Sequence, residues 1–331
     1  MSSSISSSDP AQAGWRRFGS RLLLAILGGV GVLYAFVILV DPWDVLPLSP
    51  PLPRVPISSN ARFSFPALAR SQRFDSVILG TSTARLLQPE QLNPLFGARF
   101  ANLAMNSATA WEQVQMLGVF LRAHPAPVAV LIDIDISWCG GTAERLTPRP
   151  FPDWMYGDAP WRGYREMLTP YAVQEAANQF AVLLKLKRRR YGMDGYTSFV
   201  PDDSAYDPGR VDAAFARWGL PDASPALTGD VYPLPALGQL AEALGTIPET
   251  TRVVLFFPPI HVEQQGIPGS RAAARWAACK ASVRRLAARR ATVVDLLTAN
   301  EITTRRSNYW DPLHYRAAVA GTIAARLADP D

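Results

Sequence analysis

Cysteine and histidine are scarce in this sequence, with two cysteines and three histidines among 331 residues. Cys139 and Cys279 lie far apart and form no C-x-x-C pair, which argues against a metal site built on thiolates. We therefore expect no metal and no other cofactor. The two cysteines are compatible with one disulfide in an oxidising compartment and equally with two buried free thiols.

Hallmarks of nucleic-acid and nucleotide binding are also missing. The net charge is +5, yet no zinc-finger spacing, RNA-binding aromatic signature or helix-turn-helix pattern accompanies it, so we expect no nucleic-acid partner. Neither a Walker lysine nor a G-x-G-x-x-G motif accompanies the GTST segment at 80–83, which disfavours a nucleotide- or phosphate-binding module. Disorder throughout is excluded by 48% hydrophobic and 18% charged residues.

Long apolar runs are confined to one place near the N-terminus. Residues 22–40 carry no charge over nineteen positions, and at about 1.5 Å rise per residue they span a bilayer core of about 30 Å. We expect a transmembrane helix over 18–40. A cleaved secretory signal is the alternative, but Asp41 and Pro42 follow the run where the small residues of a cleavage site would stand.

Charged residues on either side of the apolar run predict its orientation. Arg16, Arg17 and Arg21 precede the run, while Asp41 and Asp44 follow it. Because lysine and arginine are enriched on the cytoplasmic side, we expect a single-pass protein of the inner (cytoplasmic) membrane with a cytoplasmic N-terminus. The remainder of the chain would then be periplasmic or otherwise extracytoplasmic.

The segments that flank the span differ in composition from the rest. Residues 1–17 are rich in serine and predict a disordered cytoplasmic tail. Residues 41–70 predict a proline-rich spacer, because six prolines stand in 41–56 and stiffen the chain into an extended form. The folded domain is then expected over 71–331.

Short apolar runs alternate with helical patterns through the folded domain. Runs buried on both faces, with helices between them, indicate a parallel sheet in a three-layer α/β/α domain. The expected strands lie at 76–79, 100–103, 128–136, 253–257 and 292–297.

Helical patterns and one long interval complete the expected domain. A capping box at 109–112 opens a helix, and further helices are expected over 271–290 and 315–327. Residues 137–232 lack period-2 runs and predict an insertion of helix and loop that covers or carries a site. Its basic run at 185–190 is either a solvated helix end or an attractor of anionic glycan or lipid headgroups.

Two short segments have the residue types of nucleophilic catalysis. Ser82 follows the first strand, at the edge where open α/β sheets bind ligands. Asp311 and His314 stand three apart before the last helix, so the carboxylate can orient the imidazole that activates a serine. Each segment alone has a plain alternative, since the serine and the aspartate are also typical helix caps.

The order of these segments resembles the SGNH, or GDSL-like, hydrolase superfamily over residues 71–137 and 250–329. That resemblance implies a flavodoxin-like α/β/α sandwich and a catalytic triad of Ser82, His314 and Asp311. The segments DSVILGTSTARLL, FANLAMNSATAWEQ, FFPPIH and YWDPLHY are similar to membrane-anchored bacterial relatives linked to cell-envelope polysaccharides and their O-acylation.

The resemblance also points to oxyanion and substrate contacts. At the position where the family places an oxyanion-hole glycine this chain has Ser107, which keeps the backbone N–H. The third-block asparagine is missing, because Asp133 and Asp135 occupy that segment.

Three further residues are candidates near the expected site. Asn102 and Asn106 are candidate replacements for the missing asparagine donor, although each is equally a turn residue. His261, at the end of the fourth strand, is either a substrate contact or a partly buried structural histidine.

The function implied is that of a serine esterase or O-acyltransferase. It would act on acyl groups, acetyl foremost, of a cell-envelope or exported polysaccharide through an acyl-serine intermediate. Expected partners are the membrane, an acylated carbohydrate and proteins of envelope polysaccharide biosynthesis. The alternative is a catalytically weak glycan-binding or assembly subunit that keeps the fold, which the missing asparagine favours.

Overall fold

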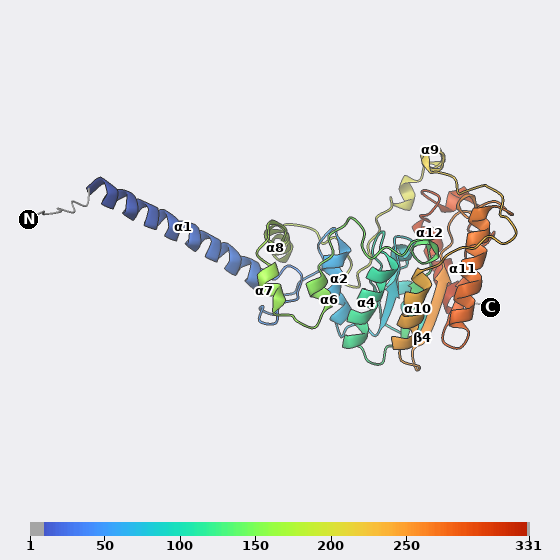
Figure 1. Ribbon diagram of the computed structural model, residues 1–331, viewed down its shortest axis with the longest axis horizontal. Coiled ribbons are helices and arrows are strands. Elements are labelled where there is room, and N and C mark those ends of the chain that lie inside the picture. The colour runs from blue at the N-terminus through green and yellow to red at the C-terminus, as the bar shows by residue number, and fades with distance from the viewer. Residues whose placement is uncertain (1–9, 330–331) are drawn as a thin grey trace, which may run out of the picture. The chain divides into compact units, whose positions relative to one another are not determined.

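The structure, a computed structural model, describes residues 10–329 and divides into two compact units. Within the described range, residues 10–54 and 159–188 form the anchor unit, and residues 55–158 and 189–329 form the α/β unit. The chain therefore passes between the two units three times. Figure 1 draws the elements of both units in sequence colours.

The anchor unit is built on α1, Pro10–Val40, which is long and apolar enough to cross a membrane. The helix begins before the expected start at residue 18. Residues 10–17, expected in a disordered tail, are therefore helical, and residues 1–9 of that tail lie outside the described residues.

Two shorter helices of the expected insertion pack with this anchor. They are α7, Arg162–Glu166, and α8, Pro170–Leu183. The rings of Phe36 and Phe180 meet edge to face at 5.6 Å between centroids, and the Tyr34 hydroxyl donates to a backbone carbonyl of α7 at 2.6 Å. The expected insertion at 137–232 thus divides between the two units. Its basic run at 185–190 is exposed.

The expected spacer is shorter than its composition suggests. Residues 41–60 contain no helix or strand, but α2, Ala61–Arg70, is a helix of the α/β unit. Its Phe65 and Leu68 are buried, and α2 packs against α4, Ala110–Ala123. Apolar burial of one helix face therefore ends the spacer before residue 61.

The α/β unit contains a parallel sheet of five strands in the order β2-β1-β3-β4-β5. All five strands lie where the apolar runs predicted them, with ends that differ by up to three residues. Their bounds are β1 Ser76–Leu79, β2 Phe100–Asn102, β3 Ala129–Asp133, β4 Arg252–Phe257 and β5 Thr292–Asp295.

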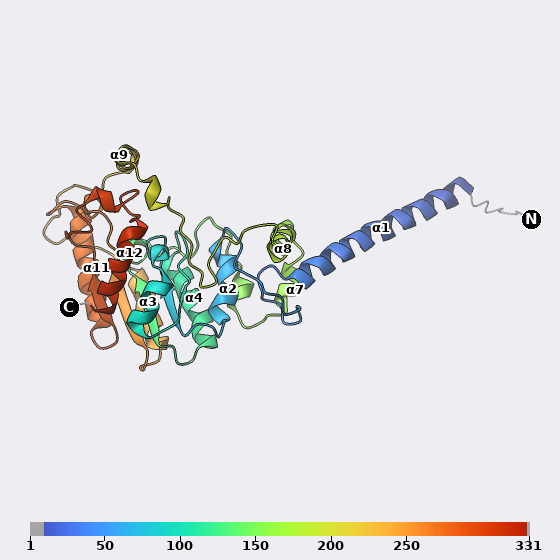
Figure 2. The same ribbon diagram turned by 180° about the vertical axis from the view of Figure 1, so that it is seen from behind.

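Helices cover both faces of this sheet, as the patterning predicted. On one face, α10, Ala236–Thr246, contacts both α4 and α11, Arg271–Ala287 (Figure 1). On the other, α3, Pro89–Phe96, packs against α12, Ala317–Ala328 (Figure 2). The capping box that opens α4 is present, with Thr109 and Glu112 exchanging both hydrogen bonds.

Short helices and loops make up the rest of the α/β unit. Residues 137–232 contain no strand, as expected. The short elements are η1 Ala84–Leu86, α5 Ile136–Cys139, α6 Asp153–Tyr156, η2 Asp203–Ala205, α9 Pro208–Arg217, η3 Val262–Gln264 and η4 Arg306–Asn308.

A disulfide joins the two cysteines, which settles the alternatives that the sequence left open. Cys139 at the end of α5 bonds to Cys279 in the middle of α11, with 5.5 Å between the Cα atoms. The bond closes a sequence separation of 140 residues. It fixes a short helix after β3 to the long helix that precedes β5.

Candidate active site

The turn after β1 presents Ser82 at the carboxyl edge of the sheet. Gly80 has φ +152°, and a Cβ added there would lie 2.5 Å from Cβ of Asp133 on the neighbouring strand. Only glycine fits so close an approach. In the sheet, β1 lies between β2 and β3, so the strand order reverses at β1. The carboxyl edge at this position is the topological switch point where such sheets bind ligands.

Ser82, His314 and Asp311 form one continuous line of hydrogen bonds. The Nε2 atom of His314 lies 2.8 Å from Oγ of Ser82, and its Nδ1 lies 2.7 Å from Oδ2 of Asp311. The imidazole side chain is 15% exposed and the carboxyl 22%, so both are shielded but reachable. These are the distances that a base-activated serine nucleophile requires.

Asp311 is held as an ionised acceptor for the imidazole. Its Oδ1 accepts backbone N–H bonds from Leu313 at 2.9 Å and His314 at 3.0 Å. Burial acts to raise the pKa of Asp311, but the hydrogen bonds and charge of His314 outweigh it, so the pKa lies below its usual value. The carboxylate therefore orients the ring without taking its proton.

Two neighbours fix the serine and the imidazole from outside this line. The hydroxyl of Tyr315 donates to the backbone carbonyl of Thr83 at 3.0 Å, which joins the histidine segment to the serine turn. The ring of Phe199 meets His314 edge to face at 5.1 Å. The hydrogen bond holds the two segments together, and the ring contact limits the orientations that the imidazole can adopt.

Two aspartates of β3 and its C-terminal end lie under the serine turn. The Thr83 hydroxyl donates to Asp133 at 2.5 Å, and the Thr81 hydroxyl donates to Asp135. Burial, reinforced by the neighbouring carboxyl, raises the pKa of Asp133 well above its usual value. Burial likewise raises the pKa of Asp135. These carboxyls position the turn through its threonines.

Residues 105–108 form a turn beside the serine. The N–H of Ala108 donates to the Met105 carbonyl at 3.0 Å, and Ser107 within this turn has φ +55°. This is the left-handed conformation that glycine adopts without strain. Within residues 10–329 the N–H groups of Ser82 and Ser107 donate to no protein group.

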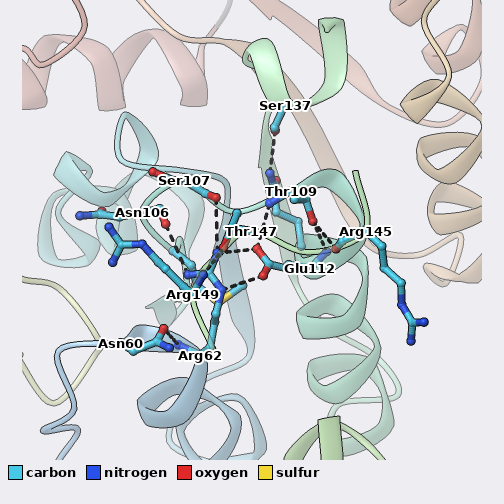
Figure 3. Close-up of polar contacts among 12 residues, drawn as sticks. Asn60, Arg62, Asn106, Ser107, Thr109, Glu112, Ser137, Arg145, Thr147 and Arg149 are labelled. Carbon is cyan, nitrogen blue, oxygen red and sulfur yellow. Dashed lines mark hydrogen bonds and ion pairs between the residues drawn. The ribbon is translucent and has the colours of Figure 1, made fainter. Parts of the chain in front are cut away.

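A buried ion pair supports that turn from below (Figure 3). The Nε atom of Arg62 donates to Glu112 at 2.8 Å, with both side chains at most 1% exposed. The two guanidinium Nη atoms each donate to one carbonyl of the turn, Asn106 and Ser107, at 3.4 Å. The pair therefore connects α2 and α4 to the backbone beside Ser82.

The two candidate asparagine donors are engaged elsewhere. The buried side chain of Asn102 donates to backbone carbonyls of Ala84 at 3.0 Å and Leu87 at 2.8 Å, so its amide holds the segment after Ser82. Oδ1 of Asn106 accepts from Arg85 at 2.9 Å. Neither amide lines the cleft beside the serine.

His261 is not among the residues that line the cleft beside the serine. Its ring meets Phe215 and Tyr309 edge to face, at 4.8 and 5.4 Å, and the residue is 2% exposed. Burial lowers its pKa. The backbone N–H of His261 donates to the Pro312 carbonyl at 2.8 Å, so this residue positions the Asp311–His314 segment rather than lining the cleft.

A cleft of about 440 Å³ opens over Ser82. Ser107, Asp135 and Leu313 line it, as do α5 and the loop that follows it. Within residues 10–329, no three His, Cys, Asp or Glu side chains gather into a group able to hold a metal ion.

Sequence reasoning did not single out several residues that build this site. They are Thr81, Thr83, Arg62, Phe199 and Tyr315. Only the two threonines carried a signal, because they flank the serine within one turn. The others come from segments distant in sequence, so only the fold brings them to Ser82.

A scan of protein-family models finds no match to the chain, and neither does a comparison with curated proteins. The class of the protein therefore follows from its fold and from the geometry of the site. It is an α/β protein with a parallel sheet of five strands, one helix able to cross a membrane, and a serine, histidine and aspartate joined by hydrogen bonds at the sheet edge.

Proposed function

We propose that this chain is an extracytoplasmic serine esterase or O-acyltransferase of the SGNH type. Its substrates would be acyl esters, acetyl foremost, of a cell-envelope or exported polysaccharide. The observation that carries the proposal is the unbroken line from Ser82 Oγ through both ring nitrogens of His314 to Asp311, opening into a cleft. The strand order β2-β1-β3-β4-β5 supports a flavodoxin-like arrangement of the SGNH kind.

The reaction follows from the roles of these groups. Ser82 Oγ attacks the acyl carbonyl while His314 Nε2 takes the hydroxyl proton, and Asp311 stabilises the imidazolium. The tetrahedral oxyanion would face the free N–H groups of Ser82 and Ser107. Collapse breaks the ester C–O bond, the sugar oxygen leaves with the proton from His314, and the acyl group stays on the serine.

In the second half of the reaction the acyl group leaves Ser82, and His314 again acts first as a base and then as an acid. A water molecule, or a hydroxyl of an acceptor sugar, gives its proton to Nε2 of His314 and attacks the acyl carbon. Water yields hydrolysis and a sugar hydroxyl yields transfer. The protein groups are the same in both cases, so the occupant of the cleft decides the outcome.

Two features support an extracytoplasmic location. Three arginines precede the apolar segment of α1 and two aspartates follow it, which favours a cytoplasmic N-terminus and an extracytoplasmic α/β unit. The Cys139–Cys279 disulfide suits an oxidising compartment such as the periplasm.

A second candidate function is a glycan-binding or assembly subunit with little catalytic activity. Asp135, which lines the cleft where the family places an asparagine donor, favours it. A carboxylate there would accept rather than donate, and would oppose a developing oxyanion. Loss of one such donor costs about 2.7 to 4 kcal/mol of transition-state stabilisation.

Covalent labelling separates the two functions. The full-length chain in detergent is treated with a fluorophosphonate probe, and the modified peptide is identified by mass spectrometry. The esterase or transferase proposal expects a single label on Ser82, with no labelling of Ser82→Ala. A folded wild-type chain that stays unlabelled under the same conditions would favour the binding subunit.

A further inference from the structure

A second pocket of about 480 Å³ adjoins the Ser82 cleft in the α/β unit. Ile136 and Leu313 line both cavities and so form the ridge between them. Leu313 directly precedes His314, and Ile136 opens α5 with 59% of its surface exposed. A ligand long enough to occupy both cavities would therefore cross this ridge to reach the serine.

Three aromatic rings, two arginines and one aspartate, Asp222, are among the residues that line this second pocket. Trp218, Tyr232 and Trp276 line it, together with Ile260. Flat apolar ring faces beside a few polar groups are typical of sites that bind ligands with one apolar face and polar edges. A pyranose ring is such a ligand, since its C–H groups and hydroxyls lie on different surfaces.

The pocket also contains a cation without a counterion. The guanidinium of Arg275 lies 5.5 Å from the ring centroid of Tyr232, and its Nη1 is buried. This Nη1 atom has no hydrogen-bond partner among the side chains and backbone that the structure describes. By contrast, Arg271 of the same wall lies 3.6 Å from Asp230. A half-buried guanidinium left unpaired loses solvation that a bound anion restores.

From these contacts we infer a subsite for an anionic sugar residue, which rests on the proposed function and names its substrate class. The ring would stack on the aromatic wall, and a carboxylate of the uronic acid type would pair with Arg275. The neighbouring sugar, carrying the acyl ester, would then cross the Ile136–Leu313 ridge to Ser82. The subsite selects polymers of acidic sugars over neutral ones.

The disulfide holds this arrangement together. Cys139 ends the helix that begins with Ile136, and Cys279 lies one turn beyond Arg275 on α11. Position 141 shows how closely the two segments approach, since a Cβ added at Gly141 would lie 3.1 Å from Nη1 of Arg275. The ridge and the cation therefore belong to one covalently linked wall.

Binding measurements on a catalytically silent protein test the subsite without relying on turnover. The full-length Ser82→Ala chain in detergent is titrated with a glucuronic acid tetramer and, separately, with a glucose tetramer of the same linkage. Tryptophan fluorescence reports binding, because two of the wall residues are tryptophans. We expect at least tenfold tighter binding of the acidic tetramer, weakened by added salt.

Variants of two arginines on α11 are titrated with the same two tetramers. Arg275→Met should weaken binding of the acidic tetramer at least tenfold and leave the glucose tetramer nearly unaffected. Arg275→Lys, which keeps the charge, should fall between. Arg285→Met on the exposed side of α11 is the matched control and should bind as the parent does.

Two results would overturn the inference. One is equal affinity of the parent for the acidic and neutral tetramers, and the other is unchanged acidic-tetramer affinity in Arg275→Met. Either leaves the proposed chemistry standing if wild type still reacts with a fluorophosphonate at Ser82. Failure of that labelling with intact tetramer binding would instead remove the esterase proposal and keep the subsite.

Discussion

The disulfide between Cys139 and Cys279 joins the helix that walls the Ser82 cleft to the helix that walls the second pocket. By constraining a loop with a sequence separation of 140, it disfavours the unfolded chain by as much as about 5 kcal/mol. We expect the Cys139→Ala/Cys279→Ala variant to lose about 2 to 5 kcal/mol, a fall in melting temperature of roughly 5 to 15 °C. Added reductant should lower the melting temperature of wild type and leave the variant unchanged. Identical melting of wild type with and without reductant would show that the bond contributes nothing.

Ester turnover should depend on the three hydrogen-bonded residues as a unit. Ser82→Ala and His314→Ala should each reduce turnover of p-nitrophenyl acetate by roughly a thousandfold or more, while Asp311→Asn retains a small residue of activity. Melting temperatures should stay close to that of wild type, because the changes are small and partly exposed. Equal turnover by folded Ser82→Ala and wild type would falsify the nucleophile assignment.

Ser107→Gly should stabilise the protein without loss of activity. A non-glycine residue at φ +55° destabilises the fold by roughly 1 to 2 kcal/mol. Glycine removes this strain, but it also gives the unfolded chain more conformational freedom, which offsets part of the gain. A net gain of about 0.5 to 1 kcal/mol is expected from denaturant unfolding. Ser107→Ala keeps the strain and should show no gain. Because both variants keep the backbone N–H, a large loss of turnover in either would argue that the serine hydroxyl itself contacts substrate.

Removing Arg62 should both destabilise the fold and loosen the turn beside Ser82. Arg62→Met leaves the Glu112 carboxylate buried without its partner, which costs about 3 to 5 kcal/mol. Arg62→Met/Glu112→Gln removes the stranded charge and should recover much of that stability. Turnover should nevertheless stay low in the double variant, because the carbonyls of Asn106 and Ser107 have lost their donor. Full recovery of turnover with stability would exclude the positioning role.

Asp133 should make the fold less stable as the pH rises. Burial raises its pKa in the folded state above the ordinary 3.8, so its stabilising effect is complete below that pH and is lost as the pH climbs through the raised pKa. Asp133→Asn should therefore lose less stability than wild type between pH 4 and pH 8. The exposed Asp329→Asn serves as the control. Parallel curves for wild type and Asp133→Asn would show that the carboxyl does not titrate in this range.

The sheet could be predicted well because each strand is a short apolar run between polar or glycine-containing segments. The end of β3 was set too late, since Ile134 and Ile136 continue the apolar run while Asp135 caps α5. The helix α2 was missed for a different reason. Pro66 stands inside it, which local rules read against a helix, yet burial of its apolar face outweighs that preference.

In the candidate site, too, the residues that lie within one short segment could be predicted, and those whose role depends on distant segments could not. Ser82 and the Asp311–His314 pair were visible because each lies within one short segment whose spacing has chemical meaning. The placement of Asn102 and His261 was not visible, because it depends on which backbone carbonyls and aromatic rings the fold brings to them. Likewise, an amphipathic pattern predicts that α8 has an apolar face without saying that α1 covers it.

The threefold passage of the chain between the two units changes how the α/β unit could be shed from a membrane. With a single tether, one proteolytic cut in the proline-containing segment before Val55 would release it. Here residues 159–188 pack on α1 and remain joined to the α/β unit at both of their own ends. A cut there would leave the α/β unit retained by noncovalent contacts alone, such as the ring contact between Phe36 and Phe180 and the hydrogen bond from Tyr34 to α7. Release would then require either dissociation of this packing or two further cuts, near residues 158 and 188.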